Sequence, residues 1–146
     1  MATTAEITLA SDIYSGYSGI TKSMTMTKAG ALTDIEETTG FSRRKLAATT
    51  AVDLITMANE LVEPADNTAA KVYIQNVGDG KGTIDKSKYV TVKIGDTGGT
   101  TQEVGRLYGG DWLLMPVTVV DDMDVVVAPS TNDAVVIEYT MFYEEA

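Results

Sequence analysis

The sequence predicts an all-β protein: an antiparallel, jelly-roll-like β-sandwich preceded by a loosely structured N-terminal segment. From residue 70 onward, apolar and polar side chains alternate in short segments with the period of two that a half-buried strand requires. Turns rich in glycine, aspartate and asparagine separate these segments, and short strands separated in this way are typical of a sandwich or jelly roll. The chain of 146 residues is long enough to bury one such core. We therefore expect an N-terminal arm at 1–30 and a sandwich domain at 31–146.

The expected arm contains one or two short strands and a tyrosine-containing loop. Residues 7–10 and 24–27 each alternate larger apolar side chains with small or polar ones, which predicts a short strand at each place. Between them, residues 14–19 form the tandem repeat Tyr-Ser-Gly-Tyr-Ser-Gly. This repeat is either a mobile loop or an arm that becomes ordered on a partner, with Tyr14 and Tyr17 supplying contact area.

Residues 42–62 fit two structures. Apolar residues recur there at helical spacing, and Ser42 could cap the start of a helix. Residues 51–57 also alternate as a strand would, after a threonine pair that suits a turn. We favour strands because everything after this segment has strand character.

The remainder of the chain is expected to form a succession of short strands. They cover residues 72–76, 89–94, 104–108, 112–120, 123–128 and 134–143. Residues 78–82 are expected to be a hairpin turn, and residues 95–99 the next turn. The first of these turns superficially resembles a phosphate loop or a calcium loop, but Lys81 precedes Gly82 and lysines occupy ligand positions, so neither motif is present.

The last strands are apolar on both faces. Residues 112–117, 125–127 and 135–137 carry nearly continuous apolar side chains, whereas an antiparallel sheet normally buries one face and exposes the other. Either the N-terminal segment or another copy of the chain must cover the second face, and we expect a homo-oligomer, with a trimer favoured. Pro116 lacks an amide hydrogen, so we expect it at a sheet edge or a bulge. The residues expected at the oligomer or partner interface are Tyr14, Tyr17, Trp112, Leu114, Val126 and Val136.

The composition argues against an enzyme. The chain has no histidine and no cysteine, which excludes Ser-His-Asp and Cys-His catalysis, thiolate ligands and most zinc sites. Paired carboxylates could hydrolyse glycosides, but the sequence alone places no pair at the separation that this chemistry requires. We therefore predict no catalytic residue and no cofactor.

Charge and hydropathy also restrict the partners. The net charge of −10 opposes nucleic-acid binding, which requires basic side chains. The densest basic run, Arg43-Arg44-Lys45, is interpreted as a solvated turn or strand edge, with docking on an acidic partner as the alternative. No stretch approaches the roughly 18 apolar residues of a membrane span, and the N-terminus lacks the features of a secretory signal. We expect a protein made in a cytoplasm, with neither nucleic acid nor membrane as its partner.

Two further ligand classes have candidate residues. Asp121, Asp122 and Asp124 could bind Ca²⁺, but a solvated turn between apolar strands explains them as well, and we predict no metal. Tyr108 and Trp112 flank a Gly-Gly turn, where exposed aromatic rings could bind a sugar. A carbohydrate-binding module is therefore kept as an alternative function.

From about residue 69, the chain resembles small β-sandwich virion proteins of tailed bacteriophages. In such proteins a strand ending in asparagine begins the sandwich, and a segment of a small residue, glycine, an acidic residue, an aromatic residue and leucine precedes the last strands. The resemblance covers about half of the chain and concerns the style of strands and turns rather than an invariant motif. It is carried by AKVYIQNVG at 70–78, YVTV at 89–92, VGRLYGGDWLLMP at 104–116 and AVVIEY at 134–139.

The resemblance implies a head-decoration, or cement, protein. Such a protein binds the outer surface of an assembled capsid between subunits of the major capsid protein, often as a homotrimer, and stabilises the shell. It would act by burying apolar surface and by pairing strands across subunits, with no catalytic residue. Its location would be the capsid surface of the virion, after synthesis in the host cytoplasm. A phage tail or neck component is the alternative within the same class.

Overall fold

The structure is a computed structural model of the chain and describes residues 4–9, 20–25, 37–57 and 68–143. The regular elements named within these ranges are all β-strands. Among the described residues, no helix has the length and apolar character needed to cross a membrane. The chain divides into two compact units, Met1–Glu36 and Glu37–Ala146. The boundary therefore follows Glu36 rather than residue 30.

The described residues of the first unit form an antiparallel hairpin. Its strands are β1 (Thr4–Leu9) and β2 (Ile20–Thr25), and the register places Leu9 opposite Ile20. The prediction of one or two short strands in this region is confirmed, although β2 begins before the expected start at residue 24. Tyr14 and Tyr17 lie outside the described residues.

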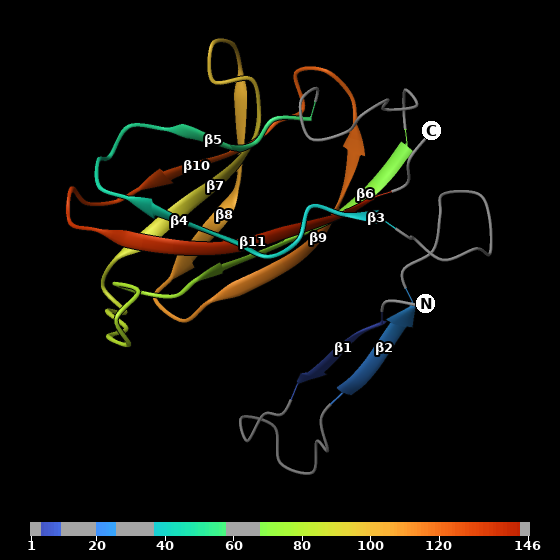
Figure 1. Cartoon of the computed structure of the whole chain (residues 1–146), viewed down its shortest axis with the longest axis horizontal. Helices are drawn as coiled ribbons and strands as arrows, with labels where there is room; N and C mark the ends of the chain where they lie inside the picture. Colours follow the sequence, from blue (N-terminus) through green and yellow to red (C-terminus); the bar gives the residue numbers. More distant parts are fainter. Residues whose placement is uncertain (1–3, 10–19, 26–36, 58–67, 144–146) are drawn as a thin grey trace. The chain divides into compact units, whose positions relative to one another are not determined.

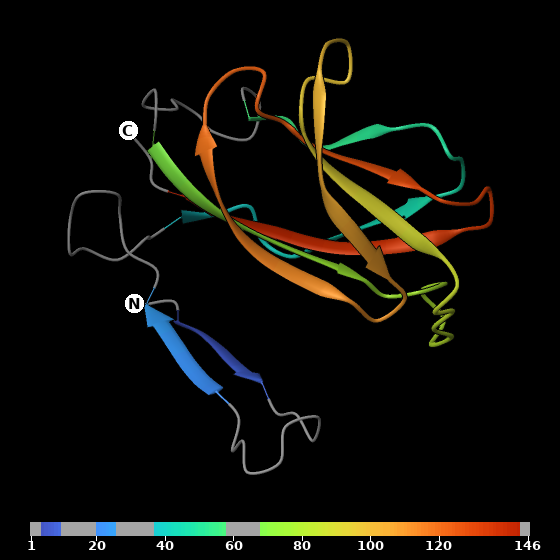
Figure 2. The ribbon, with the colours of Figure 1, turned by 180° about the vertical axis from the view of Figure 1, so that it is seen from behind.

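The second unit contains two antiparallel sheets arranged as a sandwich (Figure 1). The order in the four-stranded sheet is β5 (Val52–Ile55), β10 (Val125–Pro129), β7 (Tyr89–Gly95) and β8 (Thr101–Tyr108). The order in the five-stranded sheet is β3 (Glu37–Thr38), β11 (Val135–Tyr143), β6 (Thr68–Asn76) and β9 (Trp112–Val119), and β4 (Ser42–Leu46) also pairs with β11. Figure 2 shows the long pairing of β6 with both β9 and β11 from behind. The predicted all-β sandwich is confirmed.

The core lies between the sheets and uses one face of each strand. On β6, Val72 and Ile74 are fully buried, whereas the intervening Tyr73 faces outward. On β7, Val90 and Val92 are fully buried in the same way. The alternation seen in the sequence therefore reports which side chains face the core. The largest fully buried side chains also include Ile55, Met57, Val119, Val125, Val127, Ile137 and Met141.

Within residues 42–57 the chain forms β4 at Ser42–Leu46 and β5 at Val52–Ile55, so the favoured strand interpretation is confirmed for these two stretches. Residues 58–62 lie outside the described ranges. Pro116 lies on β9, at the edge of its sheet, which confirms the expectation for a residue that cannot donate an amide hydrogen.

The glycine-rich segments connect the strands in two ways. Residues 96–100 join β7 to β8 within one sheet, as a hairpin turn does. Residues 77–88 instead carry the chain from β6 in one sheet to β7 in the other, so the expected hairpin turn at 78–82 is wrong. Gly78 has a φ of +75°, and a Cβ added there would lie 2.1 Å from the carbonyl oxygen of Thr83. The turn at Gly78 therefore requires glycine.

The chain itself covers two of the doubly apolar strands. Val126 on β10 has no exposed area, and Val136 on β11 is 9% exposed. A Cβ added at Gly80 would lie 2.7 Å from the Cγ2 of Val136, so the 77–88 connection packs on the outward face of β11. The expected cover was either the N-terminal segment or another copy of the chain, whereas at Val136 it is the 77–88 connection, which passes from one sheet to the other. Homotrimer formation itself stays a prediction.

Candidate interaction surfaces

The six residues expected at an interface do not form one surface. Trp112 is 47% exposed and lies on the outward face of β9 together with the half-buried Leu114. Val126 and Val136 are buried within the chain, at 0% and 9% exposed, so neither offers a substantial area to a partner in this fold. Tyr14 and Tyr17 lie outside the described residues, and their role stays a prediction.

Trp112 belongs instead to a row of aromatic rings on the outward face of the five-stranded sheet. Phe41, between β3 and β4, has its ring centroid 6.0 Å from that of Tyr73 on β6. The Tyr73 centroid is in turn 6.4 Å from that of Trp112. Phe41 is 69% exposed. We call Phe41, Tyr73 and Trp112 the aromatic row.

A line of polar side chains crosses the same face beside the aromatic row. The strand register places Gln75 between Trp112 on β9 and Glu138 on β11. The Tyr73 hydroxyl donates to Oε1 of Gln75 at 2.9 Å, and Nε of Arg43 donates to Oε2 of Glu138 at 2.8 Å. Burial and the nearby charge of Glu138 raise the pKa of Tyr73 above its ordinary value of 10.0, so the hydroxyl keeps its proton at neutral pH.

The basic run Arg43-Arg44-Lys45 is therefore part of a paired strand. It lies on β4, which pairs along its length with β11. Arg43 forms the ion pair with Glu138, and Nη1 of Arg44 donates to the backbone carbonyl of Asp53. The strand-edge interpretation fits these contacts, because two of the three basic side chains already have partners within the chain.

Tyr108 does not share a platform with Trp112. Its ring centroid lies 5.2 Å from that of Tyr89 across the β7–β8 pair. The guanidinium of Arg106 lies 4.9 Å from the Tyr89 centroid, a cation–π geometry. Tyr108 and Trp112 are 39% and 47% exposed, as expected beside the Gly-Gly turn. That turn carries the chain from β8 in one sheet to β9 in the other, so the two rings lie on different sheets.

An apolar groove of about 490 Å³ opens where the edge strands β8 and β9 face each other. Its lining comes from both sheets and from the β9–β10 connection. Both edges resist strand addition, because Pro116 has no amide hydrogen and the β7–β8 register shifts at Val104. The groove therefore suits insertion of apolar side chains. The lining residues are Ile94, Val104, Met115, Pro116, Val117, Thr118 and Met123.

The hairpin of the first unit also exposes apolar side chains. Ile7, Leu9 and Met24 are 38%, 58% and 44% exposed. A two-stranded sheet is marginally stable in water unless it packs against something else. The hairpin therefore has the properties of a segment that gains stability on contact with a partner.

The acidic loop before β10 has a structural role. Asp124 is 9% exposed, and its Oδ1 accepts a 2.9 Å hydrogen bond from the amide of Met57. Burial raises the pKa of Asp124 above its ordinary value of 3.8, and the charges of Asp53, Asp96 and Asp122 add to this effect. The searched part of the chain contains no group of three or more carboxylates placed to hold a metal ion. Asp124 thus ties the end of β5 to the start of β10.

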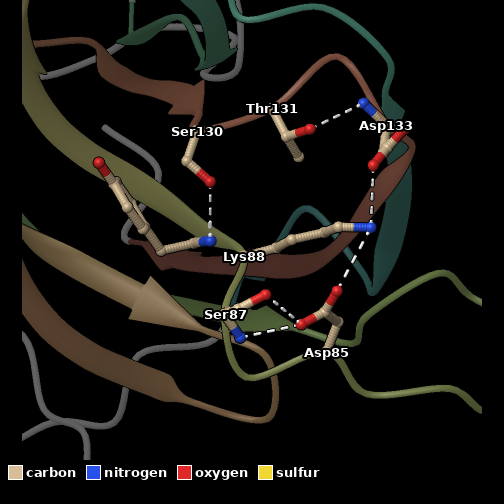
Figure 3. Close-up of polar contacts among 7 residues, drawn as sticks. Asp85, Ser87, Lys88, Ser130, Thr131 and Asp133 are labelled. Atoms are coloured by element: carbon tan, nitrogen blue, oxygen red, sulfur yellow. Dashed lines mark hydrogen bonds and ion pairs between the residues drawn. The ribbon is translucent and has the colours of Figure 1, made fainter.

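A second polar cluster joins the two connections at one end of the sandwich. Figure 3 shows the ammonium of Lys88 between Asp85 and Asp133. Its nitrogen lies 3.4 Å from the carboxylate of Asp85 and 3.0 Å from that of Asp133. These contacts raise the pKa of Lys88, and the contact with Asp133 has the larger effect. Hydrogen bonds from Ser87 to Asp85 lower the pKa of that carboxyl group. The cluster holds residues 85–88 against residues 130–133, and each charge in it has a partner.

No family model matches the chain, and no curated protein matches it. A solved structure described by the words "Bacillus endospore appendages form a novel family of disulfide-linked pili" aligns with 80% of this chain and 97% of its own, at 18% identity and a TM-score of 0.41. A similarity of this size assigns neither a family nor a function.

Proposed function

We propose that this protein is a virion structural protein that binds the outer surface of a phage capsid and stabilises it, without enzymatic activity. The observation that carries the binding role is the β1–β2 hairpin, a two-stranded sheet with exposed Ile7, Leu9 and Met24. Burial of such side chains contributes about 25 cal/mol per Å² of apolar surface removed from water. A two-stranded sheet gains this stabilisation when these side chains are covered by a partner, so we assign the hairpin the role of the capsid-binding arm.

The composition supports a binding role over catalysis. The chain lacks histidine and cysteine, the side chains on which most acyl-transfer and thiolate chemistry depends. Its charge of −10 repels a phosphate backbone, which suits a protein on the outside of a container packed with nucleic acid. The major capsid protein is therefore the partner we propose.

We further propose that the chain acts as a homotrimer. The groove between β8 and β9 is an exposed apolar surface on the sandwich, formed by side chains such as Val104 and Met123. Patches of this kind mark contact sites between proteins. A trimer would bring three hairpins to one capsid position, and simultaneous attachment makes individually weak contacts effectively tight.

Two measurements test this proposal in sequence. Multi-angle light scattering of the purified full chain should give three times the 15.6 kDa chain mass. The protein should then co-sediment with DNA-free capsids of the virus that encodes it. Co-sedimentation with isolated tails instead would reassign the chain to a tail or neck component, and a failure to bind either particle would overturn the proposal.

A matched pair of variants tests the role of the hairpin. Replacing Ile7, Leu9 and Met24 with serine should reduce capsid co-sedimentation at least ten-fold. The control is Ile84→Ser, which removes an apolar side chain that is 52% exposed on the sandwich and should bind as the original chain does. Equal binding by the triple variant would show that the hairpin is not the arm.

A further inference from the structure

We propose that the aromatic row of Phe41, Tyr73 and Trp112 is a binding platform for a neutral oligosaccharide. This site is independent of the hairpin and of the capsid proposal. The three residues come from three separate parts of the sequence, and the five-stranded sheet brings them together on its outward face. The ring planes of Phe41 and Tyr73 are inclined at 73°, and those of Tyr73 and Trp112 at 33°. The row therefore presents an uneven apolar surface of ring faces and edges, against which the C–H faces of sugar rings can pack.

The exposure of these rings is unusual for an outward sheet face. Phe41 is 69% exposed and Trp112 is 47% exposed, although the outward face of an antiparallel sheet is normally polar. The packing of the sandwich does not explain either side chain, since neither belongs to the core between the sheets. Large aromatic side chains held at a surface in this way are typical of recognition sites.

The size of the row favours a small ligand over a protein. Large aromatic side chains bury roughly 150–250 Å² each when fully covered. The exposed parts of Phe41 and Trp112 therefore amount to roughly 200 Å² in total by that measure. A standard protein interface needs about 800 Å² from each partner, whereas a few sugar rings match the area of the row.

The polar line supplies what a sugar needs beside a stacking surface. Gln75 lies next to Trp112 across the β6–β9 pair and accepts from the Tyr73 hydroxyl at 2.9 Å. Its amide group also carries two donors. Glu138 and Arg43 form their ion pair one strand further along the sheet. Planar amide, carboxylate and guanidinium groups at the margin of the rings can form directional hydrogen bonds with sugar hydroxyls.

Charge selects the neutral class of glycan. The chain carries a net charge of −10, which disfavours the approach of sulfated or carboxylated polymers. The nearby Arg43 is paired with Glu138 at 2.8 Å, so that cation is already compensated. A neutral chain of hexose or N-acetylhexosamine units is the ligand that meets these conditions.

The experiment uses Trp112 as its reporter, since it is the single tryptophan of the chain. The full-length protein is titrated with maltohexaose, cellohexaose, laminarihexaose and chitohexaose while its intrinsic fluorescence is recorded. We expect at least one of these to give a saturable change in the Trp112 emission. The absence of any saturable change up to millimolar concentrations would overturn the proposal.

Variants locate the binding on the row. Phe41→Ala alters a highly exposed side chain outside the core and should weaken binding of the active oligosaccharide at least five-fold without changing the thermal midpoint. Gln75→Ala should weaken it by a smaller factor. Tyr108→Ala, at an exposed tyrosine on the other sheet, is the matched control and should bind unchanged. Wild-type glycan affinity in the Phe41 variant would overturn the proposal. Loss of capsid binding or of oligomer mass in that variant, without any effect on glycan binding, would also overturn it, because the row would then be a protein interface.

Discussion

Val126→Ala tests whether the apolar second face of β10 is part of the folded chain or of an interface. The side chain has no exposed area within the single chain. Truncation to alanine removes two methyl groups, which costs about 1.6 kcal/mol in transfer free energy at about 0.8 kcal/mol per group. The space left behind adds roughly 1 kcal/mol for a residual cavity of about 40 Å³. The free energy of unfolding should therefore fall by about 2–3 kcal/mol.

Equilibrium unfolding in urea measures this change directly. With an m value of about 2 kcal/mol/M, which is ordinary for a domain of this size, the midpoint should fall by roughly 1–1.5 M while m stays constant. The matched control is Ile84→Ala, a truncation at a side chain that is 52% exposed and lies outside the groove. It should change the free energy of unfolding by no more than about 0.5 kcal/mol.

The alternative outcome has a distinct signature. If the burial of Val126 depended on a partner copy, Val126→Ala would lower the oligomer mass in light scattering and make the urea midpoint depend on protein concentration. A midpoint within about 0.3 M of the original chain, together with altered mass, would refute the reasoning from the single-chain fold.

Three further substitutions probe the polar and backbone features of the sandwich. Burial raises the pKa of Asp124 above its ordinary 3.8, so just above that pH the folded state binds more protons than the unfolded state and stability falls as pH rises. Asp124→Asn keeps a hydrogen-bond acceptor and should flatten that fall in thermal scans from about pH 3.5 to 6. An unchanged slope would contradict the assignment of this pH dependence to Asp124. Gly78→Ala would place a Cβ 2.1 Å from the carbonyl oxygen of Thr83 and should lower the free energy of unfolding by more than about 3 kcal/mol. The control Gly82→Ala, at a φ of +100° with open space around it, should lower it by about 1 kcal/mol in the same urea assay. Equal losses would contradict the close approach at Gly78. Asn76 is 1% exposed; its side chain donates to the carbonyl of Leu107 on β8 and accepts from the amide of Gly78, at 3.0 Å each. Asn76→Ala leaves both groups unpaired and should lower the free energy of unfolding by about 2–4 kcal/mol. A urea midpoint equal to that of the original chain would show that water replaces the side chain.

The strands could be read from the sequence because their signal is local. Val72 and Ile74 alternate with Tyr73 in the sequence, and in the structure the valine and isoleucine face the core while the tyrosine faces outward. Period-two alternation depends only on the geometry of one strand. Another local property, the missing amide hydrogen of Pro116, indicated a sheet edge or a bulge, and Pro116 lies on the edge strand β9. The local signal failed at residues 78–82, where a glycine-rich turn looks alike whether it joins paired strands or carries the chain to the other sheet.

The interaction surfaces could not be read in this way. In the sequence, Tyr73 alternates with apolar residues and Phe41 follows Gly40. Nothing in their spacing relates them to Trp112. A signal existed in the alternation that turns Tyr73 away from the core, but choosing its neighbours requires the order β11–β6–β9 in the sheet. Strand order is a non-local property, fixed by the packing of the complete sandwich.

The sequence by itself determined the all-β class, most of the strands and the absence of histidine and cysteine chemistry. Only the tertiary structure decided that the 77–88 connection covers Val136, that Val126 is buried, and that Trp112 joins Tyr73 rather than Tyr108. The physical reason is that side-chain alternation states which face of a strand is apolar, whereas the fold decides what lies against that face. Connections that cross between layers bring distant residues together, and no period in the sequence records them.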